Sequence, residues 1–530
     1  MRPFVDRIIA PFGKVVVIAN NHGPIVITVL GVTSLVALIV FVPPLSAAWT
    51  LLILRIVTTP TPTPLPPPPT PTPLILPATP TPLVLPATPT PRIGPTRMPG
   101  VFNVAVSDFG ELTAGQQVVT SEQGRLLSQW VFEDLNQELK RNAPPAFNVV
   151  VWHDSMPRSE KGSEIGTIFG SDPVQISQNA AKKADDLGAD VIVYGNLDTS
   201  HSKATLVPAF RIRELVGDTG SLNDMLDGSF ALGAPIPVDL PLDLQSKAFV
   251  NGELAARVDA AAWLTIGLTN DLNGKSQPAL DAFQKALAAI TNGEASPHGE
   301  PGDGKEIFFF FIGREDLALE RLEEGTQAFR DALVSNPSYA RAHIGLGSIY
   351  WTRARNISPP GRLQTPDLEN AFAEYRLAVI GARAAHDQQA ESQAHIALGS
   401  AFRLKGETYG FRGDYATADG LLDSAITEEL TGRQLIESRQ YRVLAYADST
   451  LGDAYYQRAN FRLLNGDKTT SRQWFEQAHD YYQQCIQQAD NDPRDTYLTR
   501  TIKQGSCEKS DQAVTKALSD LTMTATPTKS

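Results

Sequence analysis

Three kinds of hydrophobic pattern follow one another along the chain. The first is one uninterrupted apolar stretch, at residues 24–42. The second, over about residues 101–244, is a set of short apolar runs that alternate with amphipathic segments. The third, over about residues 248–521, is a long series of amphipathic segments with a helical period. These patterns predict a single membrane-spanning helix, a small α/β domain with a parallel sheet, and an all-α region, in that order.

The apolar stretch has the length of a membrane span. Residues 15–54 carry no formal charge unless His22 is protonated, and the 19 residues 24–42 are close to the roughly 20 that cross a bilayer core as a helix. Tryptophan prefers the headgroup level, so Trp49 favours an interfacial tail after the span. We therefore expect a transmembrane anchor with its interfacial tail at residues 24–57.

The charges that flank the span predict its orientation. The basic residues before it are Arg2, Arg7 and Lys14, whereas only Arg55 follows it closely. By the positive-inside rule, residues 1–23 lie in the cytoplasm and the bulk of the chain is extracytoplasmic. The competing interpretation is a cleaved signal peptide with its site near Ala47 and Ala48, although the region before the apolar core is long for one.

A proline-rich segment follows the span. Of the 39 prolines in the chain, 17 lie between Pro60 and Pro99. Proline fixes φ and removes a backbone donor, so residues 58–100 favour extended polyproline II and cannot join a sheet or a helix. We expect a stalk of up to roughly 120 Å. A proline-rich ligand for another domain and an attachment site for sugars on threonine are the alternatives.

The second pattern predicts alternating strands and helices. Buried strands are expected at residues 102–107, 147–152 and 190–197, and a fourth, antiparallel strand at 204–213. Two amphipathic helices lie between the first three strands. Ser121 is expected to cap the first helix, and Gly188 to end the second. Because parallel neighbours need a crossover connection, this order predicts a parallel sheet with helices packed against it.

This domain resembles the amino-terminal α/β domain of TolB-type envelope proteins. The resemblance lies in the segment VAVSDFGE for the first strand and GADVIVYGNL for the third, and it covers about 110 residues. It implies a domain that makes protein contacts and does not catalyse a reaction.

Three aspartates at one edge of this sheet are the chemical alternative. Asp108, Asp154 and Asp198 each follow one of the parallel strands, where open α/β folds bind ligands. Together they could hold Mg²⁺ in a cation- or nucleotide-dependent enzyme or a ligand sensor. Aspartate is also common after strands because it caps the next turn, and no phosphate-binding glycine loop accompanies these three. His153 is interpreted as a strand-end histidine.

The third pattern carries the strongest motif. Residues 261–287 place aromatic, aliphatic and small residues at the spacing of a tetratricopeptide repeat. The motif positions are Trp263, Ile266, Gly267, Gly274, Ala279, Phe283 and Ala286. Four further units follow with insertions, and a closing helix is expected near residues 497–521. The region therefore resembles a tetratricopeptide solenoid, because a single unit cannot bury its apolar face alone.

The resemblance implies a docking scaffold with a concave groove lined by the first helix of each unit. Carried onto this chain, the partner-binding positions are Arg314, Arg341, Trp351, Gln393, Arg403, Tyr446, Asp453, Tyr456 and Gln457. Arginine and tyrosine suit an extended peptide, since they combine hydrogen-bond donors with flat apolar area. The alternative is that this face is merely solvated.

Charge and composition narrow the function further. The 46 basic and 58 acidic residues give a net charge of −12, which argues against nucleic acid as a partner. The chain has neither a His-Glu-x-x-His pair nor a Gly-x-Ser-x-Gly elbow, and its one Gly-Lys-Ser sequence lacks the first glycine of a phosphate loop. We predict a membrane-anchored interaction scaffold that is not an enzyme, has no cofactor and binds a protein or peptide.

The two cysteines allow one disulfide. Cys485 is expected on the last helix of the fifth unit and Cys507 on the closing helix. Their heights along antiparallel helices would differ by about 10 Å, so a bond needs a closing helix that starts late or sits offset. Two buried reduced cysteines are the alternative. Residues 522–530 are expected to form a disordered tail.

Overall fold

The structure of the chain is a computed structural model that divides into two compact units, Met1–Thr90 and Pro91–Ser530. It describes residues 15–20, 23–28 and 97–523, the last range with gaps at 114–116, 158–162, 201–202, 217–224, 243, 293–303, 357–364, 439 and 493–500.

The first unit contributes one described element, an antiparallel hairpin of β1 (Val15–Asn20) and β2 (Gly23–Thr28). Strand β2 overlaps the first residues of the expected span at residues 24–42. The rest of that span and most of the stalk at 58–100 lie outside the described residues, so both stay predictions. Among the helices that the structure describes, none combines the length and the apolar character that a membrane crossing needs.

The second unit begins with an eight-stranded mixed sheet. Strand β3 lies between β6 and β7 and pairs in parallel with both, and β7 pairs antiparallel with β8. The strands are β3 (Phe102–Val106), β4 (Gly110–Leu112), β5 (Val118–Thr120), β6 (Val149–Trp152), β7 (Val191–Asp198), β8 (Ala204–Val216), β9 (Met225–Ala231) and β10 (Ile236–Val238). The three parallel strands and the antiparallel fourth are therefore confirmed, and β4, β5, β9 and β10 are additions.

Two helices pack against this sheet as the sequence predicts. Helix α3 (Glu122–Asn142) begins at Ser121, whose side chain accepts a hydrogen bond from the Gly124 N–H at 3.2 Å. Helix α4 (Pro173–Leu187) ends at Gly188, whose φ of 69° is the left-handed conformation that glycine adopts without strain. A single 3₁₀ turn, Pro145–Phe147, precedes β6.

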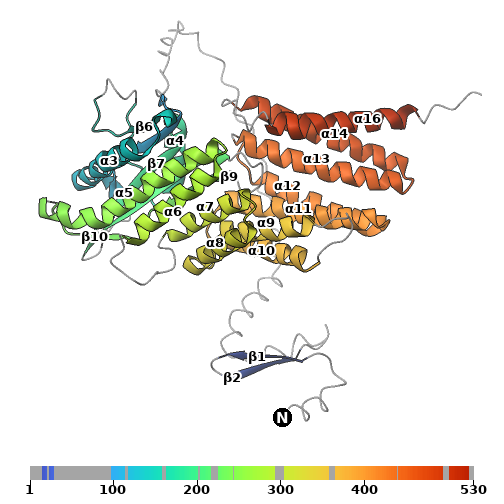
Figure 1. The fold of residues 1–530 in the computed structure, drawn as a ribbon, viewed down its shortest axis with the longest axis horizontal. Helices are drawn as coiled ribbons and strands as arrows, with labels where there is room; N and C mark the ends of the chain where they lie inside the picture. Colours follow the sequence, from blue (N-terminus) through green and yellow to red (C-terminus); the bar gives the residue numbers. More distant parts are fainter. Residues whose placement is uncertain are drawn as a thin grey trace, which may run out of the picture. The chain divides into compact units, whose positions relative to one another are not determined.

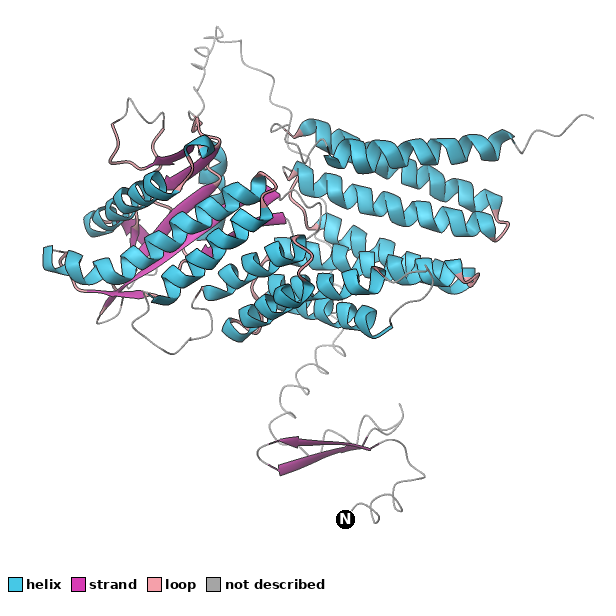
Figure 2. Cartoon of the chain, in the orientation of Figure 1, coloured by secondary structure: helices cyan, strands magenta, loops and turns pink. Residues whose placement is uncertain are grey.

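The α-helical part of the described chain follows as five helix pairs, which are drawn as coiled ribbons in Figures 1 and 2. The pairs are α5 (Leu244–Leu272) with α6 (Ser276–Asn292), α7 (Lys305–Ala318) with α8 (Leu322–Ser335), α9 (Ala340–Arg355) with α10 (Thr365–Ala384), α11 (Gln388–Phe411) with α12 (Tyr415–Gln434), and α13 (Tyr441–Leu464) with α14 (Lys468–Asn491). Consecutive pairs also contact one another, so the expected tetratricopeptide-type solenoid is observed.

The sheet and the first repeats share one hydrophobic core. A single cluster of buried side chains contains Val104 of β3 and Leu127 of α3 together with Val258 of α5 and Phe283 of α6. Helix α5 contacts α3 and β10 directly. The boundary expected between residues 244 and 248 therefore lies inside α5, and packing is continuous across it.

In each helix pair, a glycine of the first helix lies against a side chain of the second helix. In the first repeat, a Cβ on Gly267 of α5 would come within 2.4 Å of the Phe283 ring, so only glycine lets α5 and α6 approach this closely. Equivalent contacts recur in every pair. They are Gly313 with Phe329, Gly347 with Tyr375, Gly399 with Glu429, and Gly452 with Tyr482.

The solenoid ends in a closing helix that starts late. A π-helical segment, Thr501–Glu508, leads into α16 (Lys509–Met523), which packs against α14. This late start brings Cys507 beside Cys485 of α14, and the structure joins the two in a disulfide with a Cα–Cα distance of 6.0 Å. The tail expected at residues 522–530 lies mostly outside the described residues.

Candidate functional site

The candidate docking site is the surface formed by the first helices of the third to fifth repeats, α9, α11 and α13. Helix α11 contacts α9 on one side and α13 on the other. We call this the first-helix surface, and define it by its partly exposed predicted residues. These are Trp351, Arg403, Tyr446, Asp453, Tyr456 and Gln457.

Contacts between neighbouring helices make this surface continuous. The indole N–H of Trp351 on α9 donates to the backbone carbonyl of Ser400 on α11 at 3.4 Å. Further along, Arg403 Nη1 on α11 lies 3.8 Å from Asp453 Oδ2 on α13. Trp351 and Tyr446 pack against the same buried cluster. The aromatic rings are therefore held by packing while part of each remains open to solvent.

Three of the nine predicted positions are not accessible, which corrects the expectation that they line an open groove. Arg314, Arg341 and Gln393 are 2%, 1% and 2% exposed. Arg314 forms ion pairs with Asp271 of α5 and Glu315. Exposed and buried positions lie within one turn of each other on a helix. The motif spacing of the tetratricopeptide repeat did not distinguish exposed from buried positions at these three residues.

Arg341 joins the solenoid to the sheet domain. From α9 its Nη2 donates to Asp387 Oδ2 at 3.1 Å and to Gln389 Oε1 at 3.0 Å, at the start of α11. Its guanidinium also lies 5.7 Å from the Phe230 ring centre on β9, in a cation–π contact. Arg341 is thus a structural residue, and its burial depends on the sheet domain.

A cleft of about 580 Å³ lies around this junction. One wall is the sheet surface at β8 and β9, where Ser177 of α4 donates a hydrogen bond to Ser229 Oγ at 2.8 Å. The other wall is formed by the starts of α7, α9, α11 and α13. The cleft contains cationic and anionic side chains together, so its charge does not select one class of ligand.

Behind the first-helix surface, a carboxyl group of the fourth repeat lies buried in the solenoid. Glu429 of α12 is 0% exposed, and neither of its carboxyl oxygens has a hydrogen-bond partner among the described residues. Burial raises the pKa of Glu429 to about 8, with nearby Arg403 opposing the shift and Asp453 adding to it. At neutral pH this carboxyl is therefore mostly protonated.

The fifth repeat supplies the neighbouring polar contact. The Tyr482 hydroxyl on α14 donates to Asp453 Oδ1 at 2.8 Å. Arg403 Nη1 lies 3.4 Å from Glu407 Oε1 on its own helix, and one-fifth of its side chain is exposed. Arg403 and Asp453 therefore connect the first-helix surface to the buried polar group beneath it.

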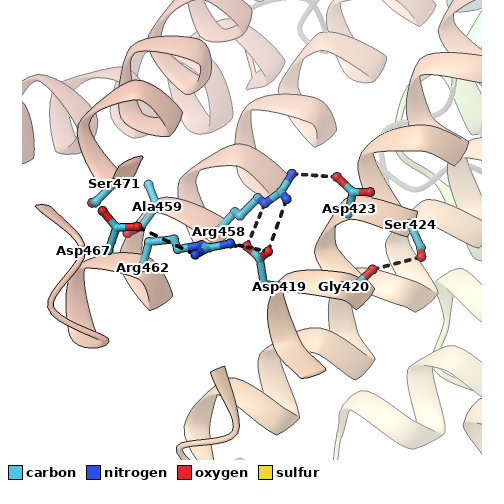
Figure 3. Close-up of polar contacts among 9 residues, drawn as sticks. All are labelled: Asp419, Gly420, Asp423, Ser424, Arg458, Ala459, Arg462, Asp467 and Ser471. Carbon is cyan, nitrogen blue, oxygen red and sulfur yellow. Dashed lines mark hydrogen bonds and ion pairs between the residues drawn. The ribbon is translucent and has the colours of Figure 1, made fainter. Parts of the chain in front are cut away.

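A second polar cluster connects the fourth and fifth repeats away from the predicted positions. As Figure 3 shows, two arginines of α13 converge on one carboxylate of α12. Arg458 Nε lies 2.9 Å from Asp419 Oδ1, and Arg462 Nη2 lies 2.6 Å from Asp419 Oδ2. Partial burial raises the pKa of Asp419, but the hydrogen bonds and charges of Arg458 and Arg462 outweigh it and lower the pKa overall. The sequence analysis missed this cluster, and the signal that could have revealed it is the spacing of Arg458 and Arg462 by four residues.

Each of the three aspartates at the sheet edge has its own neighbouring polar groups. Asp154 accepts hydrogen bonds from the backbone N–H groups of Ile165 and Gly166, and Asp198 accepts from both the backbone N–H and the hydroxyl of Ser200. Asp108 Oδ1 lies 3.4 Å from His153 Nε2. Over the residues that the structure describes, no group of three His, Cys, Asp or Glu side chains is arranged to hold a metal ion.

Comparison with known proteins gives matches among solved structures, at low identity and low TM-score. No family model matches the chain, and no curated protein matches it. Among solved structures, a thermophilic TPR protein of Thermus thermophilus is 15% identical, with 50% of this chain and 99% of that chain covered and a TM-score of 0.28. BtubC from P. vanneervenii is 14% identical, with 48% and 92% covered and a TM-score of 0.29. The MamA protein is 14% identical, with 43% and 94% covered and a TM-score of 0.25. Likeness at this level carries no argument, so the repeat architecture rests on the helix pairs described above.

Proposed function

We propose that this chain is a membrane-anchored interaction scaffold whose first-helix surface docks a protein or peptide partner. The carrying observation is the continuous row of partly exposed aromatic and polar side chains across α9, α11 and α13. Tryptophan, tyrosine and arginine are enriched among the few residues that carry most of the binding energy of protein interfaces. Rings that are already held by packing lose little conformational freedom when a partner binds.

Site-specific photo-crosslinking tests the docking surface in the full-length protein. A photoreactive amino acid replaces Gln457 on the first-helix surface or, as the matched control, the exposed Gln477 on α14. After irradiation of the host cells, we expect a discrete crosslinked partner, identified by mass spectrometry, from position 457 and none from position 477. Crosslinks from position 477 alone would move the docking site to the second helices.

The anchor is the second part of the proposal. The uncharged residues 15–54, with three basic residues before the span and one close behind it, support a single-pass anchor with the bulk of the chain outside the cytoplasm. A disulfide between Cys485 and Cys507 is compatible with that location, because such bonds persist in oxidising compartments.

Protease treatment of intact host cells tests this topology. We expect the region after Gly100 to be digested without lysis, with a membrane-bound amino-terminal fragment left behind. Mass spectrometry of unreduced peptides from the same cells should recover Cys485 linked to Cys507. Digestion only after lysis, together with two free thiols, would place the solenoid in the cytoplasm and leave the docking proposal standing on its own.

A further inference from the structure

A serine, a histidine and an aspartate meet where two parallel strands of the sheet end. Strands β3 and β6 are neighbours in register, with Ala105 opposite Trp152. The chain then continues from β3 to Asp108 and from β6 to His153 and Ser155. These three side chains therefore gather at the carboxyl edge of the sheet, the edge at which open α/β folds bind ligands.

The hydrogen bonds of His153 assign its protons. The backbone N–H of Ser155 donates to His153 Nδ1 at 3.0 Å, and an N–H group can only donate. In the neutral imidazole, Nδ1 is therefore the unprotonated nitrogen, and the proton sits on Nε2. Ser155 Oγ lies 2.8 Å from the same Nδ1, so its hydroxyl and the Ser155 N–H share the single lone pair of this nitrogen.

The opposite side of the ring is fixed by α3 and by Asp108. Ser128 Oγ donates to the Arg125 carbonyl at 2.9 Å and lies 3.1 Å from His153 Nε2, from which it accepts. Asp108 Oδ1, which is buried, lies 3.4 Å from Nε2. The imidazole stacks on the Phe132 ring at 5.3 Å between centroids and is 1% exposed. Its orientation toward Ser155 is therefore imposed by packing.

We propose that Ser155 is a reactive nucleophile, with His153 as its general base and Asp108 as the carboxylate that stabilises the imidazolium. A nucleophile within hydrogen-bond reach of a base that a third group orients is the arrangement that activates serine hydroxyls. Ser155 is exposed whereas the base is buried, so a reagent can reach Oγ while the imidazole stays shielded from water.

The step balances as an acyl or phosphoryl transfer. Ser155 Oγ forms a bond to the carbonyl carbon or phosphorus of an ester, and its proton moves to His153 Nδ1, which then no longer accepts from the Ser155 N–H. The imidazolium, facing Asp108, then returns this proton to the departing alcohol as the bond to the leaving group breaks. Water reverses the sequence and releases the acid.

A fluorophosphonate probe tests this inference on the full-length protein. The probe forms an Oγ–P bond with loss of fluoride and a proton, and mass spectrometry locates the adduct. We expect a single adduct at Ser155 that is absent in Ser155→Ala. Ser200→Ala is the matched control, because Ser200 is also exposed and follows a strand, but its hydroxyl bonds to the Asp198 carboxylate at 2.6 Å. Absence of an adduct, or an adduct at Ser200 alone, overturns the proposal.

Variants of the two supporting residues separate chemistry from folding. His153→Gln should slow labelling by about 100-fold or more, the usual contribution of a general base. Asp108→Asn should slow it by about tenfold, since the carboxylate then no longer faces the imidazolium that forms as the proton moves. An unchanged rate in His153→Gln, with unchanged circular dichroism, overturns the role of the histidine. None of these outcomes depends on the docking surface of the solenoid.

Discussion

The fourth and fifth repeats have the same spacing of glycines, but the side chain that faces the first-helix glycine is a carboxyl in one and an aromatic ring in the other. In each, a first-helix glycine lies 14 residues before the left-handed glycine of the turn, at Gly413 or Gly466, and its contact on the second helix lies 16 residues after it. In the fifth repeat Gly452 faces the Tyr482 ring, whereas in the fourth Gly399 faces the Glu429 carboxyl. Close helix approach therefore requires the glycine, but it does not require an aromatic partner.

Two of the carboxyl groups of α12, those of Asp419 and Glu429, show a second contrast, between partnered and unpartnered side chains. Asp419 receives hydrogen bonds from two arginines, and its pKa is lowered. Glu429, three turns further along the same helix, is buried without a hydrogen bond from any described residue, and its pKa is raised to about 8. In the fourth repeat, the carboxyl of Glu429 is therefore a polar group at a position where the fold provides a buried environment without a hydrogen-bond partner among the described residues. This position lies close to Arg403 on the first-helix surface.

The largest effect is expected from emptying the aromatic position of the fifth repeat. Tyr482→Ala should lower the free energy of unfolding by about 3–5 kcal/mol, because it removes a ring that is 0% exposed and leaves a cavity. Urea unfolding followed by circular dichroism measures the change. Gln477→Ala, at an exposed position of the same helix, is the control and should stay within about 0.5 kcal/mol of the parent.

Filling the corresponding position of the fourth repeat with an apolar side chain should have the opposite sign. We expect Glu429→Leu to raise the free energy of unfolding by about 1–3 kcal/mol at pH 7, since a buried carboxyl without a hydrogen bond costs stability. Arg403 keeps Glu407 and Asp453 as partners in this variant. A loss of stability in the same urea experiment would mean that Glu429 makes a favourable contact.

The pH dependence distinguishes the two carboxyl groups. The pKa of Glu429 rises from 4.5 to about 8 on folding, so the folded state binds this proton more tightly and stability falls as pH rises from about 4.5 to 8. The lowered pKa of Asp419 acts oppositely, because its contribution is lost as pH falls below its ordinary value of 3.8. Urea midpoints at pH 5, 6.5 and 8 should decline less in Glu429→Gln than in the parent. Parallel declines would show that other groups carry the dependence.

The smallest effect is expected at the ion-pair cluster between the two repeats. Asp419→Asn should destabilise the protein by about 1 kcal/mol or less, because partly exposed pairs contribute little and Arg458 retains Asp423 at 2.8 Å. The effect should shrink in 1 M salt, which screens these charges. A salt-independent loss would instead indicate a packing role for Asp419.

The sequence predicted the elements that show a regular pattern of hydrophobic residues or a local capping residue. The strands at residues 102–107 and 190–197, the caps Ser121 and Gly188, and the five helix pairs follow from local patterns. The three-residue strands β4, β5 and β10 depend on pairing with distant segments and carry too few residues for a pattern.

The candidate site was less predictable because burial of a first-helix residue depends on its neighbours. Arg341 looked like a groove residue by spacing, but β9 of the sheet domain and the start of α11 enclose it. Glu429 could have been identified by aligning the fourth and fifth repeats on Gly413 and Gly466, because this alignment gives it the position that Tyr482 occupies in the fifth repeat. The Ser155 arrangement required the register of β3 and β6, which periodicity does not supply.

The continuous core between the sheet and α5 has a practical consequence for producing the protein in pieces. Solenoids need terminal elements with a polar outer face to remain soluble, and here the sheet domain covers the first repeat. A fragment that begins at residue 248 would expose Val258 and its buried neighbours, so we expect it to aggregate on expression. A fragment that begins at residue 97 retains the cover and is the smaller soluble unit to clone.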